Sequence, residues 1–403
     1  MASLLDRNDF DIDDDLLWVM HCSEGLVPRP AAEAARRFLD KETRPWRVRW
    51  EEDFTGIPAR LREAAASLLG AVPEDITLTA TTSSGLITVA QGLSWREGDE
   101  VLLPLGEFPS NIWPWIALAS RGVAVRQQPL WEGHRAGADA WRSTAPPPDA
   151  DPEGALLDAI GPRTRVVSAS WVRFQDGLRL DLARLARGCN ERGVHLVVDG
   201  IQGAGTWPVA MECFAAFAAG GHKGLLAPQG LGILWTDPGF RRELAPLGSW
   251  LSVEQATDFA RPSTDVERDW APDGTRLEQG VPNLLNGAAL EVSLRMLTEA
   301  GTRAMARHVC ALEERLLAGL AESRAWGDDA RRLDELRRKD RLGAIVALHH
   351  GDRGPDGMNA LLQSGLERRI FASVREGYLR IAFHGWHDEQ DADRIVAWLT
   401  ESQ

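Results

Sequence analysis

The sequence has only four cysteines among its 403 residues, and they lie far apart. They are Cys22, Cys189, Cys213 and Cys310, and no two of them form a Cys-x-x-Cys pair. This spacing excludes the dense disulfide framework of small secreted proteins and the usual ligand frame of a structural zinc site. Scattered cysteines are typical of proteins that work in a reducing compartment, so we expect a cytoplasmic protein.

Long apolar runs and an excess of positive charge are also lacking. No stretch approaches the roughly 20 apolar residues that a membrane-spanning helix needs. The first residues, MASLLDRNDFDIDDD, are acidic and have neither the basic region nor the apolar core of a signal peptide. Lys and Arg number 45 against 59 Asp and Glu, which gives a formal net charge of -14. Such a charge repels nucleic acids and anionic lipids, so we expect neither as a partner.

The length and the composition predict a globular protein of two domains. A chain of 403 residues is too long for one ordinary core, and 44% of its residues are hydrophobic. Short apolar runs alternate with longer segments of helical periodicity. Most of these runs are apolar throughout, as in the strands of a parallel sheet that is covered on both faces. The predicted strands are 75–80, 100–105, 122–130, 164–170, 194–200 and 230–235.

The segments between these strands predict helices, and the alternation therefore indicates an α/β fold. They include IPARLREAAASLLG, SSGLITVAQGL, PWIALASRG and RLDLARLARGCNERG. We expect a large domain over 31–285 with a mainly parallel, doubly wound sheet. Residues 286–403 predict a smaller α+β domain, with one long helix over 286–322, a basic, loop-broken stretch, and then strand, helix, strand and helix. Residues 1–30 are expected to form an arm that packs with this smaller domain.

A carboxylate and a lysine stand in a pattern that suits pyridoxal 5′-phosphate (PLP). Asp199 ends the predicted strand 194–200, at the edge where open α/β sheets bind ligands. Lys223 follows within GGHKG, whose glycines let the backbone approach a ligand closely. PLP chemistry needs a lysine that forms a Schiff base and an anion that keeps the pyridine nitrogen protonated. Taken singly, Asp199 is better explained as a strand-end cap and Lys223 as a solvated loop lysine.

Two further segments follow strand ends in the same way. In TATTSSG, Thr82 and Ser83 stand between a predicted strand and a helix, where hydroxyl and N–H groups bind an anion such as a phosphate. Ser and Thr are also the commonest helix N-caps, so this motif alone is weak. In GEFPSN, Phe108 could stack on a planar ring, although a lone Phe more often belongs to the core.

Nucleotide and metal sites have less support in the sequence. DGIQGAG lacks the spacing of the Gly-x-Gly-x-x-Gly fingerprint, and no Gly-Lys-Ser/Thr follows a glycine-rich loop. Two groups of residues could ligate a metal, but neither is part of a His-Glu-x-x-His or comparable frame. They are His349, His350 and Asp352, and the pair His384 and His387.

Taken in order, these segments resemble the class V aminotransferases. This fold-type-I PLP family includes cysteine desulfurases, selenocysteine lyase, kynureninase and isopenicillin N epimerase. The likeness runs from HCSEGLVPRP near residue 21 to GYLRIAFHGWHDEQDADRIV near 377–396, and is most specific in VVDGIQGAGTWPV and GGHKGLLAPQGLGILW. It implies that Lys223 holds PLP as a Schiff base, that Asp199 pairs with the pyridine nitrogen and that Gln202 bonds the phenolic oxygen.

The resemblance also assigns residues to the phosphate, the ring and the substrate. It implies that Thr82 and Ser83 bind the cofactor phosphate and that His222 lies beside it. Phe108 takes the place of the aromatic residue that stacks on the ring. Near the C-terminus, Arg380 in LRIAFHGWHDEQD is expected to hold a substrate carboxylate, a task that suits a bidentate guanidinium.

The sequence departs from the family's pattern at three places. The persulfide-forming Cys of the desulfurases is lacking from the loop 365–378, so we expect no desulfuration through a thiol of that loop. Phe174 stands where desulfurases have a carboxylate-binding Asn, so the neighbouring Arg173 could share the hold on the substrate. Val281 stands where the family has a Thr that reaches the phosphate in the partner subunit, and it has no hydroxyl to offer.

The family implies a homodimer with active sites at the interface, to which residues 276–283 would contribute. We expect loss of a Cα substituent, usually the proton, with Lys223 as the proton shuttle. An aminotransferase-type reaction on an amino acid or amino-acid-like metabolite is favoured, and C–S β-elimination and epimerisation are the alternatives. A PLP-free binding protein that kept the fold is disfavoured, because Asp199, Gln202, Lys223 and Arg380 are all present.

Overall fold

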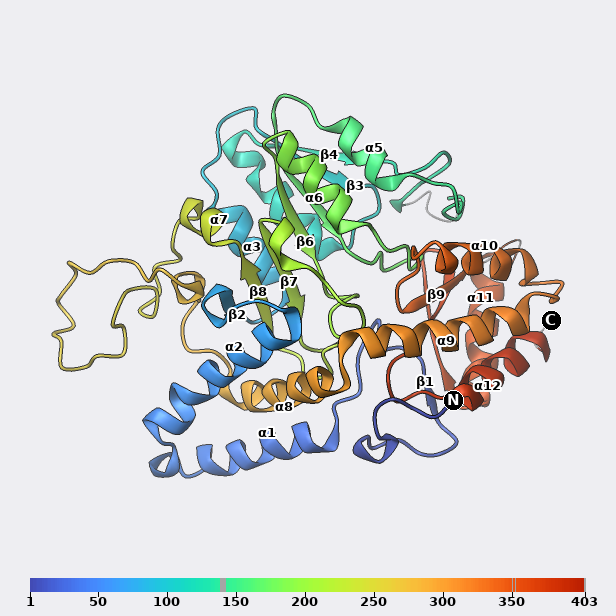
Figure 1. The fold of residues 1–403 in the computed structure, drawn as a ribbon, viewed down its shortest axis with the longest axis horizontal. Coiled ribbons are helices and arrows are strands. Elements are labelled where there is room, and N and C mark those ends of the chain that lie inside the picture. Colours follow the sequence, from blue (N-terminus) through green and yellow to red (C-terminus); the bar gives the residue numbers. More distant parts are fainter. Residues whose placement is uncertain (138–142, 350, 352, 402–403) are drawn as a thin grey trace.

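A seven-stranded sheet organises the larger part of the molecule (Figure 1). The computed structural model describes residues 1–137, 143–349, 351 and 353–401. The strands from β7 to β4 pair in parallel, whereas β8 runs antiparallel to both of its neighbours, β2 and β7. The predicted mainly parallel sheet is therefore confirmed. In spatial order the strands are β2 (Ile76–Thr79), β8 (Gly232–Thr236), β7 (Ala216–Gly220), β6 (His195–Asp199), β5 (Thr164–Ser170), β3 (Glu100–Pro104) and β4 (Ala124–Gln128).

Helices cover both faces of this sheet. Leu102 of β3 belongs to the same apolar cluster as Leu185 of α6, whereas the next residue, Leu103, packs in a second cluster with Leu86 of α3. Because neighbouring residues of a strand point to opposite faces, the sheet is buried on both sides. The doubly wound α/β architecture is thus confirmed. The helices of this part are α2 (Gly56–Leu69), α3 (Thr82–Gly92), α4 (Trp113–Ile116), α5 (Pro152–Ala159), α6 (Leu182–Glu191) and α7 (Pro238–Glu243).

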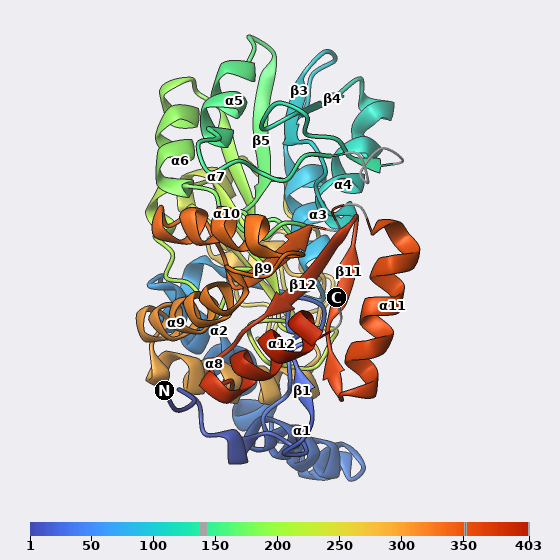
Figure 2. The same ribbon diagram turned by 90° about the vertical axis from the view of Figure 1, so that its right-hand side faces the viewer.

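The C-terminal part is built on a second, antiparallel sheet (Figure 2). Its strands, in the order β11-β12-β9, are β11 (Ser373–Arg375), β12 (Tyr378–Ala382) and β9 (Ile345–His349). Its helices are α9 (Thr302–Leu320), α10 (Gly327–Arg338), α11 (Gly354–Glu367) and α12 (Glu389–Glu401). Before them, α8 (Leu284–Ala300) packs against α1 (Arg29–Glu42) and α2. None of the helices that the structure describes is long and apolar enough to span a membrane.

The N-terminal arm joins the second sheet to the loop that carries Lys223. Its strand β1 (Leu17–Trp18) pairs in parallel with β10 (Ile370–Phe371), and Met20 forms a bridge with Ala382 of β12. Farther along, the N–H of Gly25 donates to the carbonyl oxygen of His222 over 2.7 Å. A Cβ at residue 25 would lie only 2.1 Å from the carbonyl oxygen of Lys223. Glycine is therefore required for the arm to reach this loop.

Three elements differ from the expectation. The predicted helix over 286–322 is wrong, because Gly301 adopts a φ of 81° and separates α8 from α9. The basic, loop-broken stretch predicted after it contains a regular helix, α10, which buries Ala330, Leu333 and Leu336 on one face. The strand β7 was not predicted, since its sequence AFAAG contains no β-branched residue.

Candidate active site

A cavity of about 300 Å³ lies where the ends of the sheet strands meet the N-terminal arm and β12. Asp199 is the last residue of β6, and Lys223 follows the end of β7, at the edge where such sheets bind ligands. Eight of the nine site residues predicted from the sequence line this cavity. They are Thr82, Ser83, Phe108, Asp199, Gln202, His222, Lys223 and Arg380.

Asp199 and Lys223 are both buried, with 2% and 8% of their surface exposed. The pKa of Asp199 is raised to about 7, mainly by burial and also by the charge of Glu107, while the hydrogen bond from the Ile201 N–H and the charge of Lys223 lower it in part. Burial also lowers the pKa of Lys223, which the charge of Asp199 opposes. A lysine with a lowered pKa supplies a free amine more readily. A buried carboxylate with a raised pKa is stabilised by a cationic partner, such as a pyridine N–H.

Gln202 has an amide that is only partly satisfied. Its Nε2 donates to the carbonyl oxygen of Cys22 over 2.9 Å, whereas its buried Oε1 finds no partner among the described residues. An amide nitrogen has two hydrogens, so one N–H of Gln202 remains for an acceptor such as a phenolic oxygen. A buried polar atom without a partner is costly, and it indicates that a ligand or water belongs beside it.

Hydroxyl groups surround the N-terminus of α3 at one end of the cavity. The helix begins at Thr82, and the Thr81 side chain caps it. Thr82 Oγ1 accepts the N–H of Gly220 over 2.8 Å, and Ser83 Oγ donates to Ser110 Oγ, also over 2.8 Å. The first turn of a helix leaves backbone N–H groups free and carries partial positive charge. This end of the cavity therefore suits a phosphate.

Two phenyl rings form the apolar wall of the cavity. The centroids of Phe108 and Phe174 are 5.1 Å apart and their rings are inclined by 80°, while Lys223 Nζ lies 5.5 Å from the Phe108 centroid. Phe108 is 40% exposed, so its ring offers an open face to a planar group. In the same cavity, burial and the Lys223 charge lower the pKa of His222 to about 4. His222 is therefore a neutral imidazole at neutral pH.

Arg380 is a buried cation in the cavity lining, and 2% of its surface is exposed. Its Nη1 donates to the carbonyl oxygen of Phe174 over 2.8 Å, and its Nη2 donates to Ser23 Oγ over 3.0 Å. Its Nε donates to Ser373 Oγ over 3.1 Å. Among the described residues no Asp or Glu forms an ion pair with this guanidinium. An unneutralised buried charge is unfavourable, so this position favours an anionic ligand.

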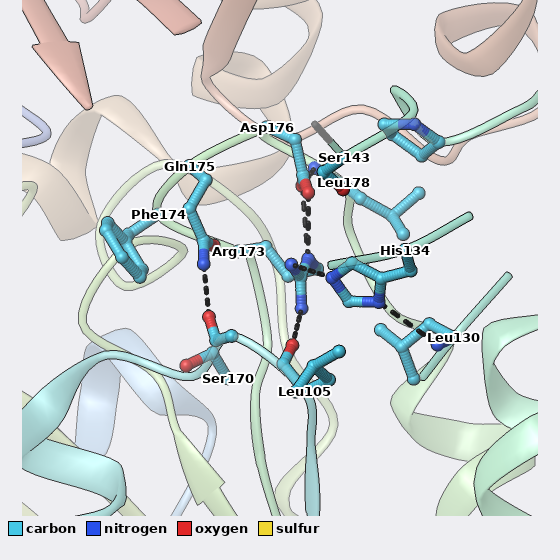
Figure 3. Close-up of polar contacts among 12 residues, drawn as sticks. Leu105, Leu130, His134, Ser143, Ser170, Arg173, Phe174, Gln175, Asp176 and Leu178 are labelled. Carbon is cyan, nitrogen blue, oxygen red and sulfur yellow. Dashed lines mark hydrogen bonds and ion pairs between the residues drawn. The ribbon is translucent and has the colours of Figure 1, made fainter. Parts of the chain in front are cut away.

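The ninth predicted residue, Arg173, lies outside the cavity lining (Figure 3). Its Nε donates to Asp176 Oδ2 over 3.0 Å, and its Nη1 donates to the carbonyl oxygen of Leu105 over 3.0 Å. Its Nη2 lies 3.1 Å from Nε2 of His134. Arg173 thus fastens the loop that carries Phe174 to the end of β3. The structure therefore places it as a support of the cavity wall.

Several residues near the site were not assigned to it from the sequence, and four of them bear on its chemistry. Cys22, Ser23 and Arg375 line the cavity, and the buried Glu107 lies behind it. Glu107 Oε1 accepts the N–H of Ser170, the residue of β5 that pairs with Asp199 of β6. Glu107 lies in GEFPSN, Cys22 and Ser23 lie in HCSEGLVPRP and Arg375 lies in the loop 365–378, but no motif gave any of them a role in the site. Cys22 and Ser23 come from the N-terminal arm and Arg375 comes from β11, and only the tertiary structure brings these segments to the cavity that Lys223 lines.

The residues considered as metal ligands are separated from this site or have backbone partners. His384 Nε2 lies 3.0 Å from the carbonyl oxygen of Gly224, and His387 Nε2 lies 2.9 Å from that of Trp18. Both histidines are fully buried, and burial lowers the pKa of His384 to about 3 and that of His387 to about 4. His350 and Asp352, from the other group, lie outside the described residues.

Comparison with known proteins identifies the family. The family model for aminotransferase class V matches residues 47–329. The chain belongs to the class V aminotransferase family. An isopenicillin N epimerase from Streptomyces clavuligerus is 30% identical over 394 residues, 93% of this chain and 92% of that protein. A probable cysteine desulfurase from Methanothermobacter thermautotrophicus is 30% identical over 261 residues, 64% of this chain but only 60% of that relative's length.

Solved structures of the family share the fold. A structure of a C-DES mutant with glycine linked to its PLP cofactor superposes with a TM-score of 0.82 and 24% identity, covering 98% of this chain and 99% of that one. This likeness confirms the fold-type-I architecture. The class V aminotransferases are PLP-dependent enzymes, and this member is one of them. The cavity fits PLP, because it combines a buried lysine, a buried carboxylate, an unsatisfied amide and a helix N-terminus.

Proposed function

We propose that this class V enzyme eliminates a sulfur substituent from Cβ of an amino-acid substrate, after Lys223 has removed the proton from Cα. The main support for this proposal is that Lys223 and the buried cation Arg380 line the same cavity. A base and a carboxylate-binding group in one cavity can hold an α-amino acid with its Cα–H bond beside the base. Asp199, Gln202, His222, Thr82, Ser83 and Phe108 are the residues that would hold PLP.

Each side chain has a separate task in this proposal. Lys223, whose pKa is lowered by burial, is the base that takes the proton from Cα. When PLP is bound, its ring accepts the electron pair left on Cα, and Asp199 keeps the ring nitrogen protonated. Arg380 holds the α-carboxylate and thereby orients Cα toward Lys223. The C–S bond then breaks with its electron pair on sulfur, while a double bond forms between Cα and Cβ.

The choice of C–S elimination comes from the relatives. The aligned relatives include cysteine desulfurases, and a cystine C–S lyase, C-DES, shares the fold with a TM-score of 0.79. In our chain the segment 365–378 has no Cys, so the sulfur is released rather than transferred to a thiol of that loop. Transamination, which the sequence favoured, and epimerisation, the activity of another relative, are the outcomes against which elimination is tested.

Product analysis separates the three reactions. The holoenzyme is incubated with cysteine, cystine and S-substituted cysteines, with and without a keto-acid acceptor, and the products are identified by mass spectrometry and chiral chromatography. Elimination releases ammonia, a keto acid and a sulfur compound without any acceptor. Products that form only with the keto acid would replace the proposal by transamination. Inversion at Cα without release of sulfur would replace it by epimerisation.

The protein is also proposed to act as a homodimer. The long loop between α7 and α8 extends away from the body of the molecule (Figure 1). On it, Trp250 and Phe259 are 43% and 67% exposed, and Phe259 packs against the 40% exposed Trp50, with the ring centroids 5.0 Å apart. Val281, within the segment 276–283, is 46% exposed. Exposed apolar groups that lie together favour an interface. Sedimentation analysis is expected to give twice the mass of the chain, and a monomer at micromolar concentration would contradict this.

A further inference from the structure

The residues that line the cavity carry more basic than acidic groups. Three basic side chains line it, Lys223, Arg375 and Arg380, whereas Asp199 is the one acidic residue in the lining that the structure describes. In the proposed function, Lys223 and Asp199 act on the cofactor and Arg380 holds the α-carboxylate of the substrate. The charge of Arg375 therefore has no assigned counter-ion.

Arg375 is placed near Arg380 by the hairpin of β11 and β12 (Figure 2). It is the last residue of β11 and stands opposite Tyr378, while Ser373 stands opposite Arg380 in the same ladder. The charge of Arg375 is close enough to help lower the pKa of Arg380, after the larger effect of burial. The two guanidiniums thus belong to one region of the cavity.

The surroundings of the two arginines differ sharply. Arg380 is buried and held by Phe174, Ser23 and Ser373. Arg375 is exposed, and no ion pair or hydrogen bond to it is found within the described residues. No ion pair joins it to the next residue, Glu376, among the described residues, and Glu376 Oε2 accepts from Gln175 Nε2 over 3.2 Å.

We propose that Arg375 binds a second carboxylate, carried by the side chain of the substrate, while Arg380 binds the α-carboxylate. The substrate class is then an α-amino acid with an additional carboxylate. This inference rests on the proposed function, because it takes Arg380 as the α-carboxylate site. A guanidinium can form two parallel hydrogen bonds with a carboxylate. Arg375 can therefore orient the second carboxylate as well as attract its charge.

Binding of unreactive acids to the holoenzyme tests this inference. Matched pairs of equal chain length are titrated by calorimetry: succinate with butyrate, glutarate with pentanoate, and adipate with hexanoate. Each pair differs in whether the far end is a carboxylate or a methyl group. We expect at least one dicarboxylate to bind about tenfold more tightly than its partner, as one charged hydrogen-bonded contact provides. Arg375→Gln removes this preference and leaves the monocarboxylate affinities unchanged.

A matched control is Arg303→Gln, which changes an exposed arginine of α9 that does not line the cavity. It is expected to leave all affinities unchanged, so that a general effect of net charge is separated from a local one. Equal affinities within every pair for the wild type, or equal losses for both members in Arg375→Gln, would refute the second carboxylate site. The PLP content of Arg375→Gln is measured in parallel by absorbance. Loss of PLP with an unchanged preference would instead assign Arg375 to the cofactor phosphate.

The two proposals fail in different ways. If the wild type prefers dicarboxylates and Arg375→Gln does not, the second carboxylate site stands even when product analysis finds transamination or epimerisation. If Arg380→Gln leaves monocarboxylate binding unchanged, the α-carboxylate site of the proposed function fails, and the second site, which rests on it, fails with it. If only the preference for dicarboxylates is lacking, the proposed function stands and the substrate class is wrong.

Discussion

Nη1 of Arg380 donates a hydrogen bond to the backbone carbonyl oxygen of Phe174 over 2.8 Å. In the desulfurase pattern an Asn side chain stands at this position and helps to hold the substrate. Here the side chain is a phenyl ring, which packs edge-on against Phe108, and only the backbone takes part in polar contacts with Arg380. Residue 174 thus holds the guanidinium of Arg380, the proposed substrate-binding group, through its backbone and forms part of the apolar wall through its ring.

Arg380→Ala is expected to raise KM for a carboxylate substrate about 30-fold or more, because a desolvated charge partner of the substrate is lost. Arg380→Lys is expected to restore part of the affinity, since an ammonium cannot form the two parallel bonds of a guanidinium. Steady-state kinetics measures both. PLP affinity serves as the control and should stay unchanged. Wild-type KM in the alanine variant would remove Arg380 from the substrate site.

Arg173→Ala is expected to act on stability rather than on KM. Arg173 and Asp176 are both 3% exposed, so removing the arginine leaves a buried carboxylate without its partner. Breaking such a pair costs roughly 3–5 kcal/mol of unfolding free energy. Thermal and denaturant unfolding measure the loss, and KM is determined on the folded fraction. A variant with wild-type stability and a strongly raised KM would show that Arg173 holds the substrate.

Asp199→Asn is expected to keep PLP bound but to slow turnover by about 10²-fold or more, on the order of 3 kcal/mol, because a neutral amide does not stabilise a protonated ring nitrogen. The raised pKa of Asp199 shows how strongly its buried position disfavours an unpaired charge. Absorbance of bound PLP and kcat are measured together. Turnover at the wild-type rate would show that Asp199 ends the strand but does not act on the cofactor.

His387 is expected to make the fold less stable in acid. Its pKa is lowered to about 4 in the folded state from the usual 6.5, so only the unfolded state binds its proton between these pH values. Stability therefore falls as the pH drops through this window, by about 1.4 kcal/mol per pH unit for one proton. Asp199, with a raised pKa, acts in the opposite direction, so the wild type is compared with His387→Gln. Parallel stability curves for the two proteins would contradict this assignment.

The sequence predicted the parts of the site that lie in local motifs. Asp199 ends a strand and the turn at Thr82 follows one that the apolar runs revealed, whereas Lys223 stood out by its glycine-rich segment GGHKG; the family pattern then gave them roles. Ser23 and Arg375 could not be found in this way. They reach the cavity because β1 pairs with β10 and because β11 and β12 form a hairpin. Neither pairing can be read from a local sequence pattern.

The errors in secondary structure have physical causes as well. α10 has so many charged residues that its composition suggested a loop, yet its apolar residues recur every third position on one buried face. β7 consists mostly of Ala and Gly, and it is a strand because β6 and β8 lie on either side of it. In both elements tertiary packing overrides the local preference.

Whether Lys223 carries the cofactor is determined by mapping where PLP is attached. The holoenzyme is reduced with borohydride, digested, and analysed by mass spectrometry, with Lys223→Ala as the comparison. We expect a pyridoxyl mass on the peptide that contains Lys223, and no labelled peptide from the variant, which should still be folded. A label on any other lysine, or an equally labelled variant, would contradict it.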